Sequence, residues 1–112
     1  MIFTEETKAY LNQFAPAKRL VQFMKEAQKN CKSEAESKQI ANIILEKERL
    51  VDEIYNLVFQ LPDSTELVLL DLRYLNDMSV EEVCSTLFMA KSTYFKYHKR
   101  ALKMLKEKRC ER

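Results

Sequence analysis

The chain contains no glycine and no tryptophan, and its only two prolines are Pro16 and Pro62. Tight β-hairpin turns favour glycine, so its absence argues against a protein built from hairpin-linked strands. No apolar run approaches the roughly 20 residues that cross a bilayer, and the N-terminal sequence MIFTEETKAY is too acidic for a signal peptide. The sequence therefore predicts an all-α protein of the cytoplasm with no membrane partner.

Few residues are suited to covalent chemistry or metal binding. Cys31, Cys84 and Cys110 are odd in number and widely spaced, which favours reduced thiols over a disulfide framework or a zinc site. His98 is the single histidine, and no catalytic dyad or phosphate-binding glycine loop accompanies it. We therefore expect a protein that is not an enzyme and that uses no cofactor or metal.

Charge is unevenly distributed along the 112 residues. Residues 89–112 contain nine Lys or Arg and two Glu, a net charge of +7, whereas residues 1–88 contain ten basic and fifteen acidic residues, a net charge of −5; the sum is +2. This asymmetry predicts a cationic surface near the C-terminus, and therefore an anionic partner.

Apolar residues in the first half recur at helical spacing. They predict a short helix at residues 4–14, a second at about 16–30 and, after a polar turn, a long helix at about 37–61. The long helix carries an apolar stripe, interrupted only by Lys47: Ile40, Ile43, Ile44, Leu50, Val51, Ile54, Leu57 and Val58.

This stripe needs a cover, which leaves two arrangements open. The preceding helix folds back as an antiparallel hairpin, or a second copy of the chain supplies the same stripe in a coiled coil. The hairpin is favoured because residues 20–27 offer a complementary stripe nearby, and the two arrangements can coexist. The eight stripe residues are therefore candidate dimer or partner contacts.

The second half contains start signals for further helices. Pro62 ends the long helix, and Asp63 or Ser64 can cap the next one. Ser79 and Glu82 have the spacing of a capping box, which opens another helix. The buried face of the helix after Pro62 is predicted to comprise Leu67, Leu70, Tyr74 and Leu75. A turn at residues 88–90 then leads to a basic last helix at about 91–108.

Five short blocks of this half, in fixed order and without a gap, resemble region 4 of sigma factors. The blocks are Leu61-Pro62, Leu72-Arg73-Tyr74-Leu75, Ser79-Val80-Glu81-Glu82-Val83, Lys91-Ser92-Thr93 and Arg100-Ala101-Leu102. The long helix before them also resembles the small phage-encoded regulators of late genes, the RinA-type activators. The resemblance covers residues 61–105 well and 37–60 loosely. It implies an N-terminal helical segment, residues 1–61, followed by a helix-turn-helix domain, residues 62–112.

The resemblance also implies a recognition helix at residues 91–103, lying in the major groove of double-stranded DNA. The residues placed to face DNA are Lys91, Ser92, Thr93, Phe95, Lys96, Lys99, Arg100 and Lys103. The last two are better placed for phosphates than for bases. The residues expected to pack inward are Tyr94, Ala101, Leu105 and either Tyr97 or His98. Arg73 either touches a phosphate or is a surface residue.

Three residues of this region are unusual for sigma region 4. Phe88 replaces the usual turn glycine, so it must take a positive φ, at a cost of about 1 kcal/mol, or form a different turn. Ala90 replaces the usual capping serine, so Ser92 can cap instead and shift the helix start. Phe95 is an exposed aromatic that can contact a thymine methyl group.

We therefore expect a DNA-binding transcription regulator encoded by a phage or prophage. RNA polymerase or another host protein, and a second copy of the chain, are further candidate partners. The unusual turn supports an alternative in which the same fold is a protein-interaction module that binds a host or regulatory protein. Two simpler alternatives are a structural helical dimer formed through residues 40–61 and a basic helix that is only a solvated surface.

Overall fold

The computed structural model describes residues 2–110, with side chains from residue 5 onward. Its elements are α1 (Ile2–Leu11), α2 (Phe14–Lys29), α3 (Glu34–Val58), α4 (Thr65–Leu70), the π-helical segment η1 (Asp71–Leu75), α5 (Val80–Leu87) and α6 (Lys91–Cys110). No strand occurs in this range, which confirms the predicted all-α class. Within the same range, no helix has the length and apolar character needed to cross a membrane.

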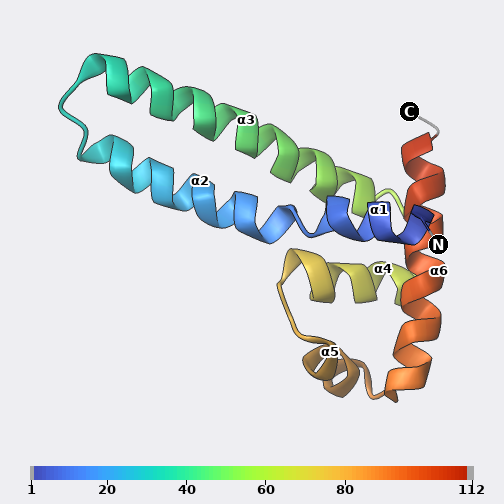
Figure 1. Ribbon diagram of the computed structural model, residues 1–112. Helices are drawn as coiled ribbons and strands as arrows, with labels where there is room; N and C mark the ends of the chain where they lie inside the picture. Colours follow the sequence, from blue (N-terminus) through green and yellow to red (C-terminus); the bar gives the residue numbers. More distant parts are fainter. Residues whose placement is uncertain (1, 111–112) are drawn as a thin grey trace.

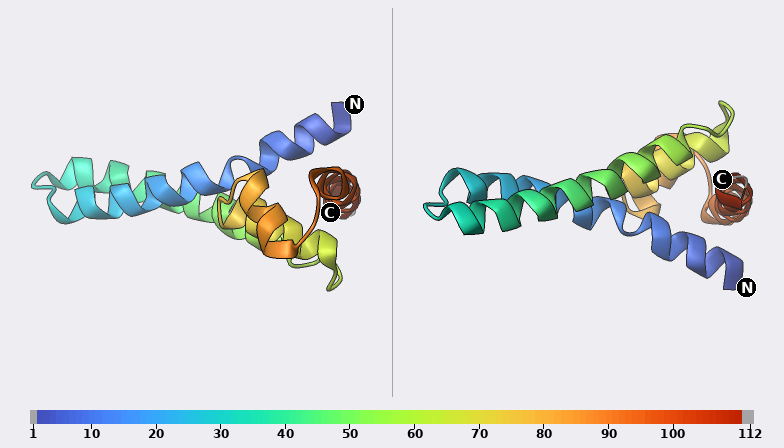
Figure 2. Two further views of the ribbon diagram at one scale, coloured as in Figure 1. Left: turned by 90° about the horizontal axis from the view of Figure 1, so that it is seen from below. Right: turned by 90° about the horizontal axis from the view of Figure 1, so that it is seen from above.

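Helices α2 and α3 form an antiparallel hairpin that projects from the rest of the molecule (Figures 1 and 2). Pro16 lies in the first turn of α2, where its missing amide costs no helical hydrogen bond. Ser33 caps α3 by accepting a hydrogen bond from the Glu36 amide at 3.4 Å, so α3 begins earlier than the predicted residue 37. The hairpin was one of the two predicted covers for the long helix, and it is the one observed.

The hairpin changes the interpretation of the predicted partner stripe. Four of its residues, Ile44, Ile54, Leu57 and Val58, are buried within the chain, so the prediction that they contact a partner is wrong. They hold α3 against its own neighbours instead, because α2 packs along α3 and α6 contacts it as well. The other four residues are only partly buried: Ile40, Ile43, Leu50 and Val51.

One hydrophobic core joins the two halves of the chain. It combines Tyr10, Leu11 and Phe14 with the end of α3, with α4 and η1, and with the inner face of α6. Helix α1 packs along α6, and the guanidinium of Arg109 lies 3.8 Å from the centre of the Tyr10 ring. The predicted boundary between residues 61 and 62 is therefore not a break in packing. The part that stands apart is the hairpin (Figure 2).

The predicted caps of the second half are present. Ser64, rather than Asp63, caps α4 by accepting a hydrogen bond from the Leu67 amide at 3.3 Å. Ser79 and Glu82 form the predicted capping box, with both hydrogen bonds at 3.1 Å. The four residues predicted to be buried after Pro62 are all buried: Leu67, Leu70, Tyr74 and Leu75.

Candidate functional site

Helices α5 and α6 are joined by a short turn at residues 88–90. The Phe88 amide donates to the Ser85 carbonyl at 3.4 Å, and the Met89 amide donates to the Cys84 carbonyl at 3.0 Å, the hydrogen-bond pattern of a Schellman motif. This motif needs a left-handed residue, and Phe88 supplies it with φ 54° and ψ 50°. Of the two predicted possibilities, the positive φ is therefore the one observed. The Phe88 side chain is 95% exposed, so no packing offsets this conformation.

Helix α6 begins at Lys91, and the Ala90 carbonyl accepts its first hydrogen bond, from the Tyr94 amide at 2.9 Å. The predicted shift of the start towards Ser92 is therefore wrong. Backbone geometry alone is sufficient to begin the helix, because the turn already brings the Ala90 carbonyl into position.

The inner face of α6 packs against α4 and α1. Its buried residues are Tyr94, His98, Ala101, Leu102 and Leu105. Tyr97 is only partly buried, so of the two residues predicted as alternatives it is His98 that packs inward. These side chains fix the rotation of α6 about its axis, and this rotation decides which residues face solvent.

His98 lies within a small aromatic cluster. Its Nε2 is 2.7 Å from the Tyr74 hydroxyl, and its ring stacks on the rings of Tyr94 and Tyr74. Burial, helped by the positive charges of Lys8 and Arg73, lowers the pKa of His98 to about 4. Burial raises the pKa of Tyr74 to about 12. At neutral pH both groups are therefore uncharged, and they form a hydrogen bond that ties α6 to η1.

The outer face of α6 carries an exposed stripe, which we call the basic stripe: Ser92, Lys96, Lys99 and Lys103. Steps of four, three and four residues place these side chains on one side of the helix. Among residues 5–110, the three lysines have no ion-pair partner. Within the described part of the chain, the stripe is therefore a row of positive charges that no carboxylate pairs with.

Thr93 and Phe95 flank the basic stripe. Thr93 is partly buried, whereas the Phe95 side chain is 53% exposed. The Phe95 ring meets the buried Tyr94 ring edge-on, with centroids 5.1 Å apart. All eight residues predicted to face DNA are thus exposed except Thr93, which is partly buried.

Two of the predicted cationic contacts have partners within the chain. Lys91 pairs with Glu81 of α5 at 3.1 Å, and since both side chains are more than 60% exposed this pair is weak and easily exchanged. A backbone hydrogen bond and then Lys91 lower the pKa of Glu81. Arg100 pairs with Glu66 of α4 at 3.3 Å, and the Glu66 side chain is only 11% exposed.

Arg100 therefore has a structural role that the sequence did not reveal. Its guanidinium lies 5.4 Å from the centre of the Tyr97 ring and neutralises the nearly buried Glu66 carboxylate. The only sequence signal for this contact is the acidic residue in the first turn of α4, which the helix dipole alone also explains.

Arg73 is partly buried and makes contacts within the chain. Its Nη1 donates a hydrogen bond to the Met78 carbonyl at 3.0 Å, and its guanidinium lies 5.4 Å from the centre of the Tyr74 ring. Arg73 thus closes the turn between η1 and α5.

The fold and this site define an all-helical protein with a projecting hairpin and a basic C-terminal helix. Residues 24–106 match the model of the family described as "Protein of unknown function (DUF1492)", and the chain belongs to this family. The match runs from within α2 into α6 and so includes the end of α2, all of α3 and the basic stripe. Comparisons with curated proteins and with solved structures gave no match.

Proposed function

We propose that the protein binds double-stranded DNA through α6 and regulates transcription. The observation that carries the proposal is the basic stripe: Lys96, Lys99 and Lys103 lie on one exposed side of a helix whose opposite side is anchored in the core. Phosphate oxygens are the natural partners of such a row, because neutralising them releases condensed counterions from DNA.

The geometry of α5 and α6 supports this proposal. Two helices joined by a tight turn, with the second one exposed and basic, resemble the helix-turn-helix arrangement, in which the second helix enters the major groove. The distance along α6 from Ser92 to Lys103 is about 17 Å at 1.5 Å per residue, which corresponds to about five base pairs. One helix can therefore contact bases and flanking phosphates together.

The proposal gives individual residues different tasks. Ser92 and Lys96, in the first half of α6, are placed for base edges, whereas Lys99 and Lys103 are placed for phosphates. Thr93 and Phe95 offer methyl and aromatic surface to thymine methyl groups. Arg100 contributes to DNA binding indirectly, by holding α6 on α4. Its Nη1 contacts Glu66, so this nitrogen does not reach DNA.

Binding to duplex DNA at several salt concentrations tests the proposal. If Lys91, Lys99 and Lys103 neutralise three phosphates, log K should fall with log salt with a slope of about −3. Lys99→Ala and Lys103→Ala should each reduce that slope by about 1 and weaken binding to all sequences. Lys96→Ala should also change site preference.

A matched control is Lys38→Ala, which removes an exposed lysine from the hairpin and should leave both affinity and slope unchanged. The proposal fails if the wild-type protein does not bind DNA at low salt, or if the Lys38 variant loses as much affinity as the stripe variants. A genomic position beside phage packaging genes would support the phage or prophage regulator.

A second candidate function is binding to a host or regulatory protein, and the exposed rings favour it. Phe88 and Phe95 are 95% and 53% exposed and lie on either side of the start of α6. In that case Phe95→Ala should abolish a protein complex, whereas Lys99→Ala should leave it intact. The opposite pattern supports DNA binding.

A further inference from the structure

The exposed lysines along α6 differ in one respect. Lys96, Lys99 and Lys103 have no ion-pair partner among residues 5–110, whereas the Lys91 ammonium lies 3.1 Å from Oε1 of Glu81. Glu81 stands in the first turn of α5, and Lys91 is the first residue of α6. The ion pair therefore bridges the two helices at the end of α6 that the proposed function places nearest to base edges.

The carboxylate of Glu81 is not needed for the cap of α5. Glu82, the next residue, closes the capping box, because its Oε1 accepts a hydrogen bond from the Ser79 amide at 3.1 Å. The Glu81 side chain is 68% exposed, and a backbone hydrogen bond and then Lys91 lower its pKa, so it is ionised at neutral pH. A negative charge thus lies beside the cationic start of α6, on the side where DNA would bring further negative charges.

On the basis of that proposed function, we propose that Glu81 limits the affinity of α6 for DNA by competing with a backbone phosphate for Lys91. The ammonium contacts Glu81 at nearly the distance at which it would contact a phosphate, so the two anions compete for the same three N–H donors. Because both side chains are more than 60% exposed, the exchange is possible, but it costs the protein part of its affinity.

Repulsion adds to this competition. A phosphate on the far side of the Lys91 ammonium would lie only about 6 Å from the Glu81 carboxylate, and like charges at this separation repel. Competition and repulsion together should weaken binding roughly 3- to 10-fold. Binding to non-specific DNA is almost wholly electrostatic, so this loss makes base contacts a larger share of the binding that remains.

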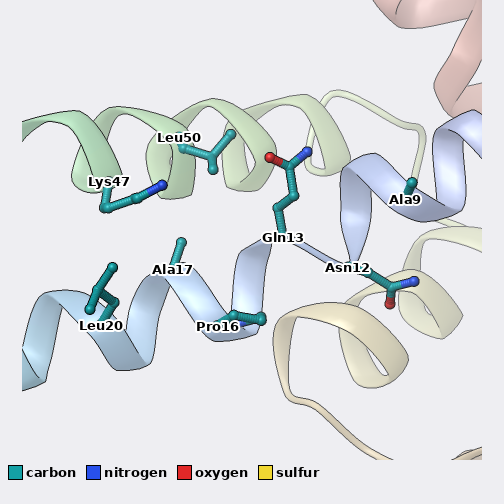
Figure 3. A pocket seen from close by; sticks show the side chains of 8 residues that line it. All are labelled: Ala9, Asn12, Gln13, Pro16, Ala17, Leu20, Lys47 and Leu50. Carbon is teal, nitrogen blue, oxygen red and sulfur yellow. The ribbon is translucent and has the colours of Figure 1, made fainter.

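The hairpin supplies a matched control. Lys25 of α2 and Glu48 of α3 form an ion pair of the same 3.1 Å length, with side chains 53% and 44% exposed. This pair lies on the polar side of the hairpin, whereas the groove of about 340 Å³ on the opposite side is mainly apolar, with Pro16, Leu20 and Leu50 among its walls (Figure 3). Because the hairpin projects away from α6 (Figure 1), Glu48→Gln frees a lysine in the same way but away from the proposed DNA surface.

Binding to one short DNA duplex at about 0.1 M salt, where the Debye length is about 10 Å, tests the proposal. Glu81→Gln should bind roughly 3- to 10-fold more tightly than wild type. Glu82→Gln removes the adjacent charge but keeps an acceptor for the capping box, so it should gain at most about twofold. Glu48→Gln should leave the affinity unchanged. Equal gains in the Glu81 and Glu82 variants overturn the proposal, because net charge alone would then explain them.

Combination with Lys91→Ala separates competition from simple repulsion. Without Lys91 there is no ammonium to compete for, so the gain from Glu81→Gln should be smaller by a factor of about two or more in this background. An equal gain in both backgrounds overturns the proposal. In the absence of DNA, NMR titration should show that Lys91→Ala raises the pKa of Glu81, and an unchanged pKa also overturns the proposal.

The outcomes for wild type separate the two levels of the proposal. If wild type and Glu81→Gln both fail to bind DNA at low salt, the proposed function is refuted, and the competition for Lys91 with it. If wild type binds and Glu81→Gln binds no more tightly, only the role of Glu81 is refuted.

Discussion

The left-handed conformation of Phe88 has a measurable cost. A residue with a β-carbon in this region is destabilised by about 1–2 kcal/mol relative to the right-handed conformation, and glycine avoids this penalty. Glycine in turn costs about 0.5–1 kcal/mol through the greater freedom of the unfolded chain. Phe88→Gly should therefore stabilise the protein by about 0.5–1 kcal/mol.

Phe88→Ala separates the backbone from the ring. Both variants remove the same 95% exposed side chain, but only glycine relieves the conformation at φ 54°. Alanine should leave the free energy of unfolding within about 0.5 kcal/mol of wild type, as expected for a surface substitution.

Urea unfolding measures the difference. With a slope of about 2 kcal/mol per molar, the glycine variant should have a midpoint about 0.3–0.5 M above that of the alanine variant. The reasoning is refuted if glycine is no more stable than alanine, or if alanine is destabilised by more than about 1 kcal/mol, because the ring would then be packed. If the Phe88 ring contacts a protein partner, the glycine and alanine variants should lose affinity for that partner equally.

Two further predictions concern the inner side of α6. The pKa of His98 falls from 6.5 to about 4 on folding. The neutral form of His98 therefore stabilises the protein above pH 6.5. This contribution, at most about 3 kcal/mol, is lost as the pH falls towards 4. Unfolding of wild type and His98→Gln at about pH 7 and about pH 4 should show a larger loss in the wild type; equal losses would contradict the assignment. Arg100→Met should lower stability by about 1–3 kcal/mol, because the 11% exposed Glu66 side chain loses its counter-charge. Adding Glu66→Gln to this variant should restore part of the lost stability. If thermal unfolding shows no recovery, the Arg100–Glu66 pair is unimportant for stability.

Local signals in the sequence were sufficient for most of the secondary structure. The capping box of Ser79 and Glu82 acts through nearby backbone, so the sequence predicted it correctly, and the lack of glycine correctly indicated an all-α fold. The long helix, predicted to run to about residue 61, ends at Val58. The basic stripe was also predictable, because helical periodicity alone places Lys96, Lys99 and Lys103 on one side of α6.

Contacts between distant segments were not predictable in the same way. The pairing of Arg100 with Glu66 spans 34 residues and depends on how α6 lies on α4, which no local pattern encodes. The packing of α1 on α6, which joins the two predicted domains in one core, depends likewise on the tertiary arrangement.

The long helix α3 shows most clearly what the sequence determined and what the tertiary structure decided. Its apolar stripe by itself determined that α3 would be helical and would need a cover, because buried apolar area is the main driving force for folding. Only the tertiary structure decided that α2 provides this cover. It also decided which residues of the apolar stripe stay partly exposed, since the angle at which two helices cross sets which side chains the neighbouring helix contacts. The sequence determined the helices and their faces, and the tertiary structure determined which faces meet.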